Sequence, residues 1–445
     1  MRTFRIVVVI IAALTATIPV AAQQPAPVTD TRAAYDAAFE ETLRKPADPP
    51  TLLRYAELAV QVGNLEGAIS ALERLLLIDD DQPKIKLELG VLYYRLGSYE
   101  AARGYLESAR TSSRASAETK ERTDQFLKEI DSKSSKSQFS GDLLFGIGYS
   151  TNANTGPAGA IQSFGATVVP TPTVSGRPDF NVIGAGTLRH RYDLGRQDDG
   201  ALESDLAFYG SRQFQVSEAN VYLFDFTTGP RTSPFEDGLL SDMTVKPFFT
   251  GRYVSVNNQP SYWAWGAGME ATTPLGPQIN SALTVFGRRR AFLNNPDAPF
   301  NDLSSGNEAV AVLDFRVDLT SYMTLSLNGA FTRFIADADF ESYTEFGVGG
   351  AMQVRFTDPL GINGRIWSAT ASASTVQAAY DAPDPTVNPF IARNQFDVNL
   401  GFVLLVPLND RLTLVGQANY TQRTASLSNY AYDAFTTLVG IGWRF

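Results

Sequence analysis

The sequence contains no cysteine and only one histidine, His190. Without cysteine there is no disulfide framework, no thiolate nucleophile and no thiol for lipid attachment behind a leader segment. The lone histidine lies in "LRHRYDL", away from any Ser or Cys motif, and is expected to be structural. Metal-ligand spacings, a phosphate-binding loop and a G-x-S-x-G motif are also missing from the sequence. We therefore expect no catalytic centre, no metal and no cofactor, and the chain is predicted not to be an enzyme.

Charged residues are scarce as well, at 19% of the 445 residues. The 37 basic and 47 acidic side chains give a formal net charge of -10. A nucleic-acid partner would require clustered Lys and Arg on one face. The charge balance therefore argues against nucleic-acid binding.

The N-terminus has the pattern of a targeting segment. Arg2 and Arg5 precede an apolar run at residues 6–14, and small residues at 20–22 offer a cleavage site. The run is shorter than the roughly 20 apolar residues that span a bilayer. Residues 1–22 are thus predicted to be a signal peptide, which together with the absence of cysteine suits an envelope protein of a Gram-negative bacterium.

Residues 23–137 are predicted to form a helical domain with an internal repeat of 34 residues. "YAELAVQVGNLEGAISALERL" begins at Tyr55, and "LGVLYYRLGSYEAARGYLESA" begins at Leu89. The shift of 34 aligns Leu58 with Leu92, Gly63 with Gly97, Glu66 with Glu100, Ala68 with Ala102, and Leu72 with Leu106. Each unit is expected to be two helices joined at a glycine turn, with the alanines allowing close helix approach.

This pattern resembles the tetratricopeptide repeat. The helices expected at about 31–45 and 116–131 would cap a short solenoid. In that family the first helix of each pair lines a groove for peptides. Transferred to this sequence, the resemblance implies Gln61, Tyr94 and Arg95 as groove residues; ordinary solvated or packing roles for the same residues stay open.

The chain from 138 to 445 changes to a period of two. In "VAVLDFRVDLT" the apolar set at 311, 313, 315, 317 and 319 alternates with Asp314, Arg316 and Asp318. Similar segments of about ten residues, separated by Gly, Asn, Asp and Pro, are typical of a transmembrane barrel. We count fourteen, with starts near 139, 179, 201, 221, 242, 261, 279, 308, 323, 343, 365, 395, 411 and 434.

A soluble β-sandwich would also alternate, but three features favour a barrel in the outer membrane. The signal peptide directs the chain to the envelope, aromatic residues recur near segment ends, and short connections alternate with long ones. The fold class is therefore predicted as multidomain, α then β. An N-terminal tetratricopeptide-like α-helical solenoid in the periplasm is followed by a C-terminal antiparallel transmembrane β-barrel of about 14 strands, surrounded by membrane lipid.

The last segment alternates Val439, Ile441, Trp443 and Phe445. A final strand of this kind must close against the first strand of the barrel. It also resembles the C-terminal signal recognised by the barrel-assembly machinery, which makes that machinery an expected partner.

Many charged residues fall on the predicted inward face. The candidate lumen charges are Arg252, Arg288, Asp314, Arg316, Asp318 and Arg355. Because Arg288 to Arg290 are consecutive, at least one of them must oppose the alternation or lie at the rim. Two interpretations stay open: a salt-bridge ladder that stiffens the lumen, or a polar path for a translocating chain or solute.

Repeats followed by a barrel of this size resemble the surface lipoprotein assembly modifiers and their relatives. The resemblance rests on "LELGVLYYRLGSYEAARGYLESA", "ERTDQFLKEI" and "GDLLFGIGYSTNANTGP". It implies help in moving exported proteins or lipoproteins through or onto the outer membrane, with periplasmic repeats receiving the client. Two alternatives have the same order of parts: a porin for exopolysaccharide export, and a plain diffusion pore with a scaffold domain.

Overall fold

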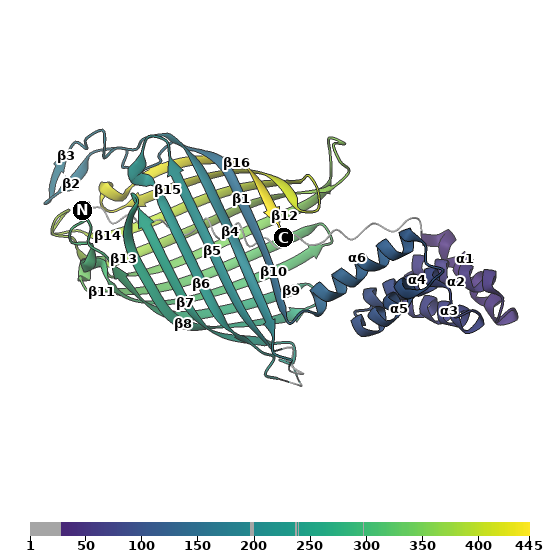
Figure 1. Ribbon diagram of the computed structural model, residues 1–445. Helices are drawn as coiled ribbons and strands as arrows, with labels where there is room; N and C mark the ends of the chain where they lie inside the picture. Colours follow the sequence, from purple (N-terminus) through teal and green to yellow (C-terminus); the bar gives the residue numbers. More distant parts are fainter. Residues whose placement is uncertain (1–27, 196–199, 236–237, 239, 297) are drawn as a thin grey trace. The chain divides into compact units, whose positions relative to one another are not determined.

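The structure is a computed structural model that describes residues 28–195, 200–235, 238, 240–296 and 298–445. These residues form two compact units, one of helices up to Gln138 and one of strands from Phe139 onward (Figure 1). The predicted signal peptide, residues 1–22, lies outside the described residues.

The first unit consists of six helices. They are α1 (Val28–Arg44), α2 (Pro49–Gln61), α3 (Leu65–Ile78), α4 (Pro83–Arg95), α5 (Tyr99–Thr111) and α6 (Ala117–Ser134). Gly63 and Gly97 follow α2 and α4 with φ of 85° and 77°, a conformation that glycine adopts without strain. Asn64 then caps α3, its Oδ1 accepting a hydrogen bond from the Gly67 N–H at 2.9 Å. The predicted helical repeats are thus confirmed.

The small residues of the repeat set the spacing of the helices. Ala68 and Ala102 are fully buried. At Gly90 of α4, a Cβ atom would lie 2.5 Å from Leu106 Cγ of α5, so only glycine allows this approach. The apolar core of this unit therefore lies between its helices.

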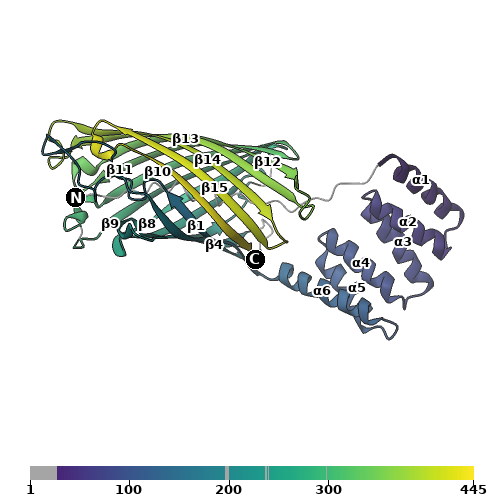
Figure 2. The ribbon, with the colours of Figure 1, turned by 90° about the horizontal axis from the view of Figure 1, so that it is seen from above.

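The second unit is a closed barrel of fourteen antiparallel strands, as predicted. The strands are β1 (Ser137–Ser150), β4 (Asp179–Asp193), β5 (Ala201–Gln213), β6 (Val221–Arg231), β7 (Thr244–Val256), β8 (Gln259–Gly276), β9 (Ile279–Phe292), β10 (Gly306–Thr320), β11 (Met323–Ala336), β12 (Tyr343–Thr357), β13 (Ile366–Pro383), β14 (Ala392–Pro407), β15 (Leu412–Ala425) and β16 (Tyr432–Arg444). Figures 1 and 2 show the strands running obliquely around the barrel. We call the end that holds Ser137 and Phe445 the near end and the opposite end the far end.

The last strand closes the barrel against the first. β16 pairs with β1 in a continuous antiparallel register in which Phe145 lies opposite Ile441. The closing pair extends to Phe445, whose N–H donates to the Gly141 carbonyl at 3.1 Å while its own carbonyl accepts from the Gly141 N–H at 3.0 Å. Closure leaves no open sheet edge, which a barrel in lipid requires.

One element of the barrel unit was not predicted. The connection between β1 and β4 carries a small hairpin, β2 (Ile161–Ser163) with β3 (Ala166–Val168). The Phe164 N–H donates to the Thr386 carbonyl at 3.0 Å, and the Gln162 N–H donates to Asn429 Oδ1 at 2.7 Å. Strands of three residues carry too little alternation to be recognised, and these partners lie more than 200 residues away in sequence.

Among the helices of the described residues, none is both long and apolar enough to cross a bilayer.

Candidate functional site

The lumen has two walls of different chemistry. Strand register places alternate residues of each strand on the inner face, and a cavity of about 930 Å³ opens among them. We call the inward residues of β4–β10 the charged wall, because ion pairs dominate it. We call the uncharged middle of β11–β15 the neutral wall.

At the near end of the barrel, the charged wall contains a connected network of ion pairs. Lys246 Nζ lies 2.9 Å from Asp205 Oδ2 and 3.3 Å from Glu203 Oε2. Arg231 then bridges Glu203 Oε2 at 2.9 Å and Glu270 Oε1 at 2.6 Å. The Lys246 side chain is only 5% exposed, so these groups neutralise one another at the wall.

Further along the charged wall, the predicted arginines also have acidic partners. Arg252 pairs with Asp225, and Arg288 shares Glu308 with Arg290. For these residues, the structure has the contacts of a salt-bridge ladder.

The three consecutive arginines divide between two faces, as their spacing requires. Arg289 lies on the opposite face of β9 from Arg288 and Arg290, and its Nη2 lies 2.8 Å from Asp337 Oδ2. Asp337 follows the end of β11, so this pair sits at the far rim.

Three other predicted lumen charges lie toward the near end. Arg316 Nη2 lies 3.4 Å from Asp318 Oδ1, and Asp318 also accepts from the Thr324 hydroxyl at 2.7 Å. Arg355 Nη2 donates to Thr324 Oγ1 at 3.3 Å. These contacts join β10, β11 and β12 at their near ends.

Asp314 differs from the other predicted lumen charges. It lines the cavity, and no ion pair holds it among the residues that the structure describes. Strand register places it opposite Asn328, at the border between the two walls.

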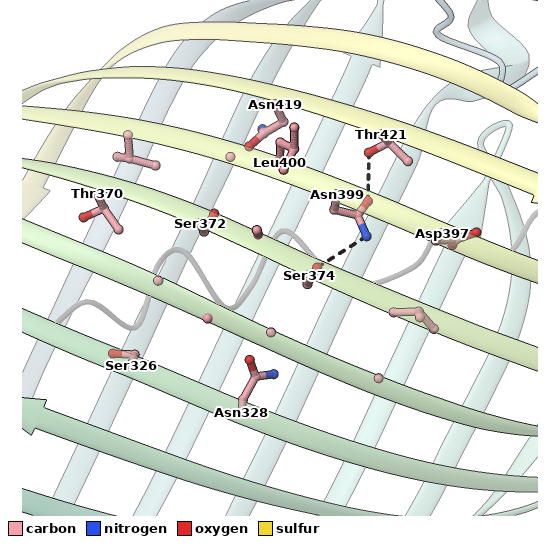
Figure 3. Close-up of a pocket in the computed structure, with 18 of the residues that line it drawn as sticks. Ser326, Asn328, Thr370, Ser372, Ser374, Asp397, Asn399, Leu400, Asn419 and Thr421 are labelled. Atoms are coloured by element: carbon pink, nitrogen blue, oxygen red, sulfur yellow. Dashed lines mark hydrogen bonds between the residues drawn. The ribbon is translucent and has the colours of Figure 1, made fainter.

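The neutral wall is formed by hydroxyl, amide and very small residues (Figure 3). Its cavity-lining members include Ser326, Asn328, Gly349, Ala351, Thr370, Ser372, Ser374, Asn399, Gly401, Asn419 and Thr421. On β13 the signal is visible in "WSATASASTV", where the inward residues at 368, 370, 372 and 374 all carry hydroxyls. The candidate residues predicted from the sequence were inward-facing charges only, and they did not include this wall.

Hydrogen bonds link some of these side chains to one another. Asn399 Nδ2 donates to Ser374 Oγ at 3.4 Å, and the Thr421 hydroxyl donates to Asn399 Oδ1 at 3.0 Å. Gly401 leaves room for its neighbours: a Cβ there would lie 2.5 Å from Ser372 Oγ. The wall is therefore mainly polar and is uncharged over its middle.

Buried ion pairs close the far end of the neutral wall. Arg423 Nε donates to Asp397 Oδ1 at 2.6 Å, with both side chains at least 90% buried. Arg393 lies over the rings of Tyr380 and Tyr430, its Cζ 3.5 and 4.3 Å from their centroids. These contacts fix the ends of β13, β14 and β15 relative to one another.

The three candidate groove residues lie in two different environments. Gln61 and Arg95 are exposed at equivalent positions of the repeat, at the ends of α2 and α4. The Tyr94 ring instead packs 5.8 Å from Tyr99 and 5.6 Å from Phe126, between centroids. Two of the three are thus available to a partner, and the third joins α4 to α5 and α6.

A tyrosine pair stabilises the same unit. The Tyr93 and Tyr105 hydroxyls both donate to Glu73 Oε1, at 2.7 and 3.1 Å, and the two rings stack with centroids 5.5 Å apart. The hydrogen bond to Glu73 raises the pKa of Tyr93 to about 12. This polar contact links α3, α4 and α5.

The remaining singled-out residues lie on the outer surface of the barrel. His190 stacks on Phe139, with ring centroids 4.4 Å apart. Val439, Ile441 and Trp443 project outward from β16 and are exposed. Across the described part of the chain, no group of three His, Cys, Asp or Glu residues could hold a metal ion.

Residues 59–118 match the family model described as "Tetratricopeptide repeat". No curated protein sequence matches the chain. The chain therefore combines a tetratricopeptide-like helical unit with a closed barrel of the outer-membrane type.

Solved structures similar to each unit differ strongly from it in sequence. The helical unit is similar to the type III secretion chaperone SycD of Yersinia enterocolitica in complex with a peptide of the translocator YopD, at 18% identity and a TM-score of 0.22, covering 23% of this chain and 82% of that one. It is also similar to PcrH from Pseudomonas aeruginosa, at 15% identity and a TM-score of 0.18. That match covers 25% of this chain and 98% of PcrH. The barrel is similar to an anion-selective porin from Comamonas acidovorans, at 11% identity and a TM-score of 0.36. That match covers 69% of this chain and 99% of the porin.

Proposed function

We propose that this protein is a non-enzymatic outer-membrane factor that assists the translocation or surface assembly of exported proteins or lipoproteins. In this proposal the helical unit lies in the periplasm and receives the client, and the barrel spans the membrane. The barrel-assembly machinery inserts the chain, using the C-terminal signal that ends at Phe445.

The observation that carries the proposal is the fusion of the two units in one chain. A barrel that serves only as a pore needs no repeat domain, whereas stacked helical repeats present an extended surface to another protein. Exposed apolar side chains surround the barrel, including Phe145, Leu400 and Val439, and they match a hydrocarbon environment.

Client contact is assigned to the exposed ends of α2 and α4. Gln61 and Arg95 occupy equivalent positions one repeat apart and offer an amide and a guanidinium to an extended peptide. The Tyr94 ring packs against Tyr99 and Phe126. It would therefore influence client contact only indirectly, by holding α4 against α5 and α6.

The test uses cells that lack the protein and express either the full chain or a shortened chain. The full chain should restore surface exposure of the client, measured by protease treatment of intact cells. A chain without residues 31–137 should insert as a folded barrel and fail to restore it. Full restoration by the shortened chain would contradict the proposal, and loss of surface polysaccharide instead of protein would support the exopolysaccharide alternative.

A finer variant tests the assigned surface. Gln61→Ala combined with Arg95→Ala should reduce client exposure without changing the amount of inserted protein. The matched control is Glu66→Ala combined with Glu100→Ala, since these residues are also exposed and one repeat apart, on α3 and α5. Equal loss in both pairs would contradict the assignment to α2 and α4.

A further inference from the structure

We propose that the neutral wall makes the lumen a path for small uncharged polyhydroxylated solutes, with sugars as the chemical class, and that it disfavours charged solutes of the same size. This function goes beyond client handling and does not depend on it. It rests on the contrast between the two lumen walls.

The charged wall offers little attraction to a passing ion. Its basic groups at Lys246, Arg231 and Arg252 all have carboxylate partners within the wall. A charge that is paired in this way produces a weak field at a distance, because the two signs cancel. An ionic solute in the lumen would therefore lose part of its hydration and meet few unpaired counter-charges, with Asp314 as the exception on this wall.

The neutral wall offers replacements for the hydrogen bonds that a neutral solute makes with water. Hydroxyls and amides can both donate and accept, so Ser372, Asn419 and their neighbours suit a sugar hydroxyl in any orientation. The acids that line the cavity lie around this middle region: Asp314 on β10, Glu345 on β12 and Asp397 on β14, the last paired with Arg423. A cavity of about 930 Å³ is within the range of volumes of small-molecule sites.

Unsatisfied acceptors at the far end of the cavity point to a hydrogen-bonding solute. Asn181 Oδ1 and Gln213 Oε1 line the cavity, are buried as atoms and have no hydrogen-bond partner among the described residues. Asn181 is only 8% exposed. Buried acceptors without partners are rare in folded proteins, and a solute hydroxyl would satisfy them.

The uncharged surface continues out of the lumen. The far-end connection contains no charged residue from Ser150 to Gly176, and its first residues, Ser150, Asn152 and Thr155, also line the cavity. A neutral solute would thus meet uncharged hydrogen-bonding groups on this connection at the far mouth and again in the middle of the neutral wall, beyond the Arg423–Asp397 pair.

The experiment measures swelling of liposomes that contain the purified full-length protein. Glucose, gluconate and glucosamine serve as neutral, anionic and cationic probes of similar size. Glucose should enter faster than either charged probe by about threefold or more, which corresponds to about 0.7 kcal/mol in the free energy of entry.

Two variants place a charge in the middle of the neutral wall. Ser374→Asp should increase glucosamine entry relative to gluconate, and Ser374→Lys should do the opposite. Thr173→Asp, on the exposed far-end connection, is the control and should change the ratio less.

Heat-modifiable migration of the protein on gels establishes that the barrel is folded in every preparation. Three results would overturn the proposal: equal entry of all three probes, no entry of glucose through a folded barrel, or shifts of the same sign in both Ser374 variants.

Discussion

The helical unit and the barrel place apolar side chains on opposite surfaces. In the helical unit Leu72 and Leu106 are buried at 5% and 0% exposure. In the barrel Leu400 and Val439 are exposed at 49% and 64%, while charged pairs such as Arg423 with Asp397 are buried toward the lumen.

Burial alone therefore does not identify the stabilising residues of this chain. In water, apolar burial drives folding of the helical unit. In a membrane the outer surface is solvated by hydrocarbon, so apolar exposure has no cost and the internal polar contacts must be complete. The residues most sensitive to substitution are therefore expected to be polar in the barrel and apolar in the helical unit.

The largest effect is expected from breaking the buried pair at the far end of the barrel. Arg423→Met would leave Asp397 buried without its cation, at an expected loss of about 3–5 kcal/mol in the free energy of unfolding. Urea unfolding of the barrel in detergent micelles measures it. Arg423→Met combined with Asp397→Leu should recover most of the loss; if the double variant is as unstable as the single one, the pairing does not explain the effect.

In the helical unit the corresponding sensitive residue is apolar. Leu106→Ala removes a fully buried side chain that packs against Gly90, and should lower the free energy of unfolding by about 2–5 kcal/mol. Thermal unfolding followed by the helical circular dichroism signal measures this loss. The barrel transition serves as the internal control, and a shift of that transition by the same amount would contradict the division into two units.

Two exposed leucines should respond differently to the same charge. Leu400→Arg places a charge toward lipid and should destabilise the barrel by about 2–4 kcal/mol. Leu77→Arg, at a position 87% exposed on α3, should change the helical unit by less than about 0.5 kcal/mol. Unfolding in lipid vesicles measures both, and equal effects would contradict a membrane environment for β14.

The smallest effect concerns pH and the Tyr93 hydroxyl. Its pKa in the folded unit is raised to about 12 from 10.0, so between these values the unfolded chain loses the proton first. Stability contributed by this group is therefore complete below pH 10 and is lost as the pH rises toward 12.

Tyr93→Phe should cost about 1–2 kcal/mol at neutral pH, because it removes a hydrogen bond to a carboxylate. It should also make the loss of stability above pH 10 less steep, without abolishing it, because burial raises the pKa of Tyr55 to about 12 as well. Helical unfolding curves between pH 8 and 12 measure the change, and an unaltered slope would show that the Glu73 contact is not responsible.

The sequence predicted the fold well because local patterns determine it. The glycine at 63 and its repeat equivalent at 97 marked the helix turns, and period-two alternation marked all fourteen barrel strands. Six predicted strand starts, including those at 179, 201 and 343, coincide with the structure. The alternation is strong because each strand contacts lipid on one face and the lumen on the other.

The sequence predicted less of the site because strand register decides which side chains meet. Arg288 was expected to face the lumen, but its partner Glu308 depends on how β9 aligns with β10. The neutral wall likewise forms only when β11 to β15 lie side by side. The family resemblance implied a groove position for Tyr94, whereas its packing against Phe126 depends on how α6 lies against α4.

The central claim is that residues 138–445 surround a polar lumen with lipid-facing side chains, and labelling of single cysteines tests it most directly. The natural chain contains no cysteine, so Ala371→Cys, Ser372→Cys, Ala373→Cys and Ser374→Cys on β13 each introduce one reactive thiol. In lipid vesicles a water-soluble maleimide should label the cysteines at 372 and 374 and spare those at 371 and 373. Uniform labelling of all four, or protection of the even-numbered positions, would contradict the account.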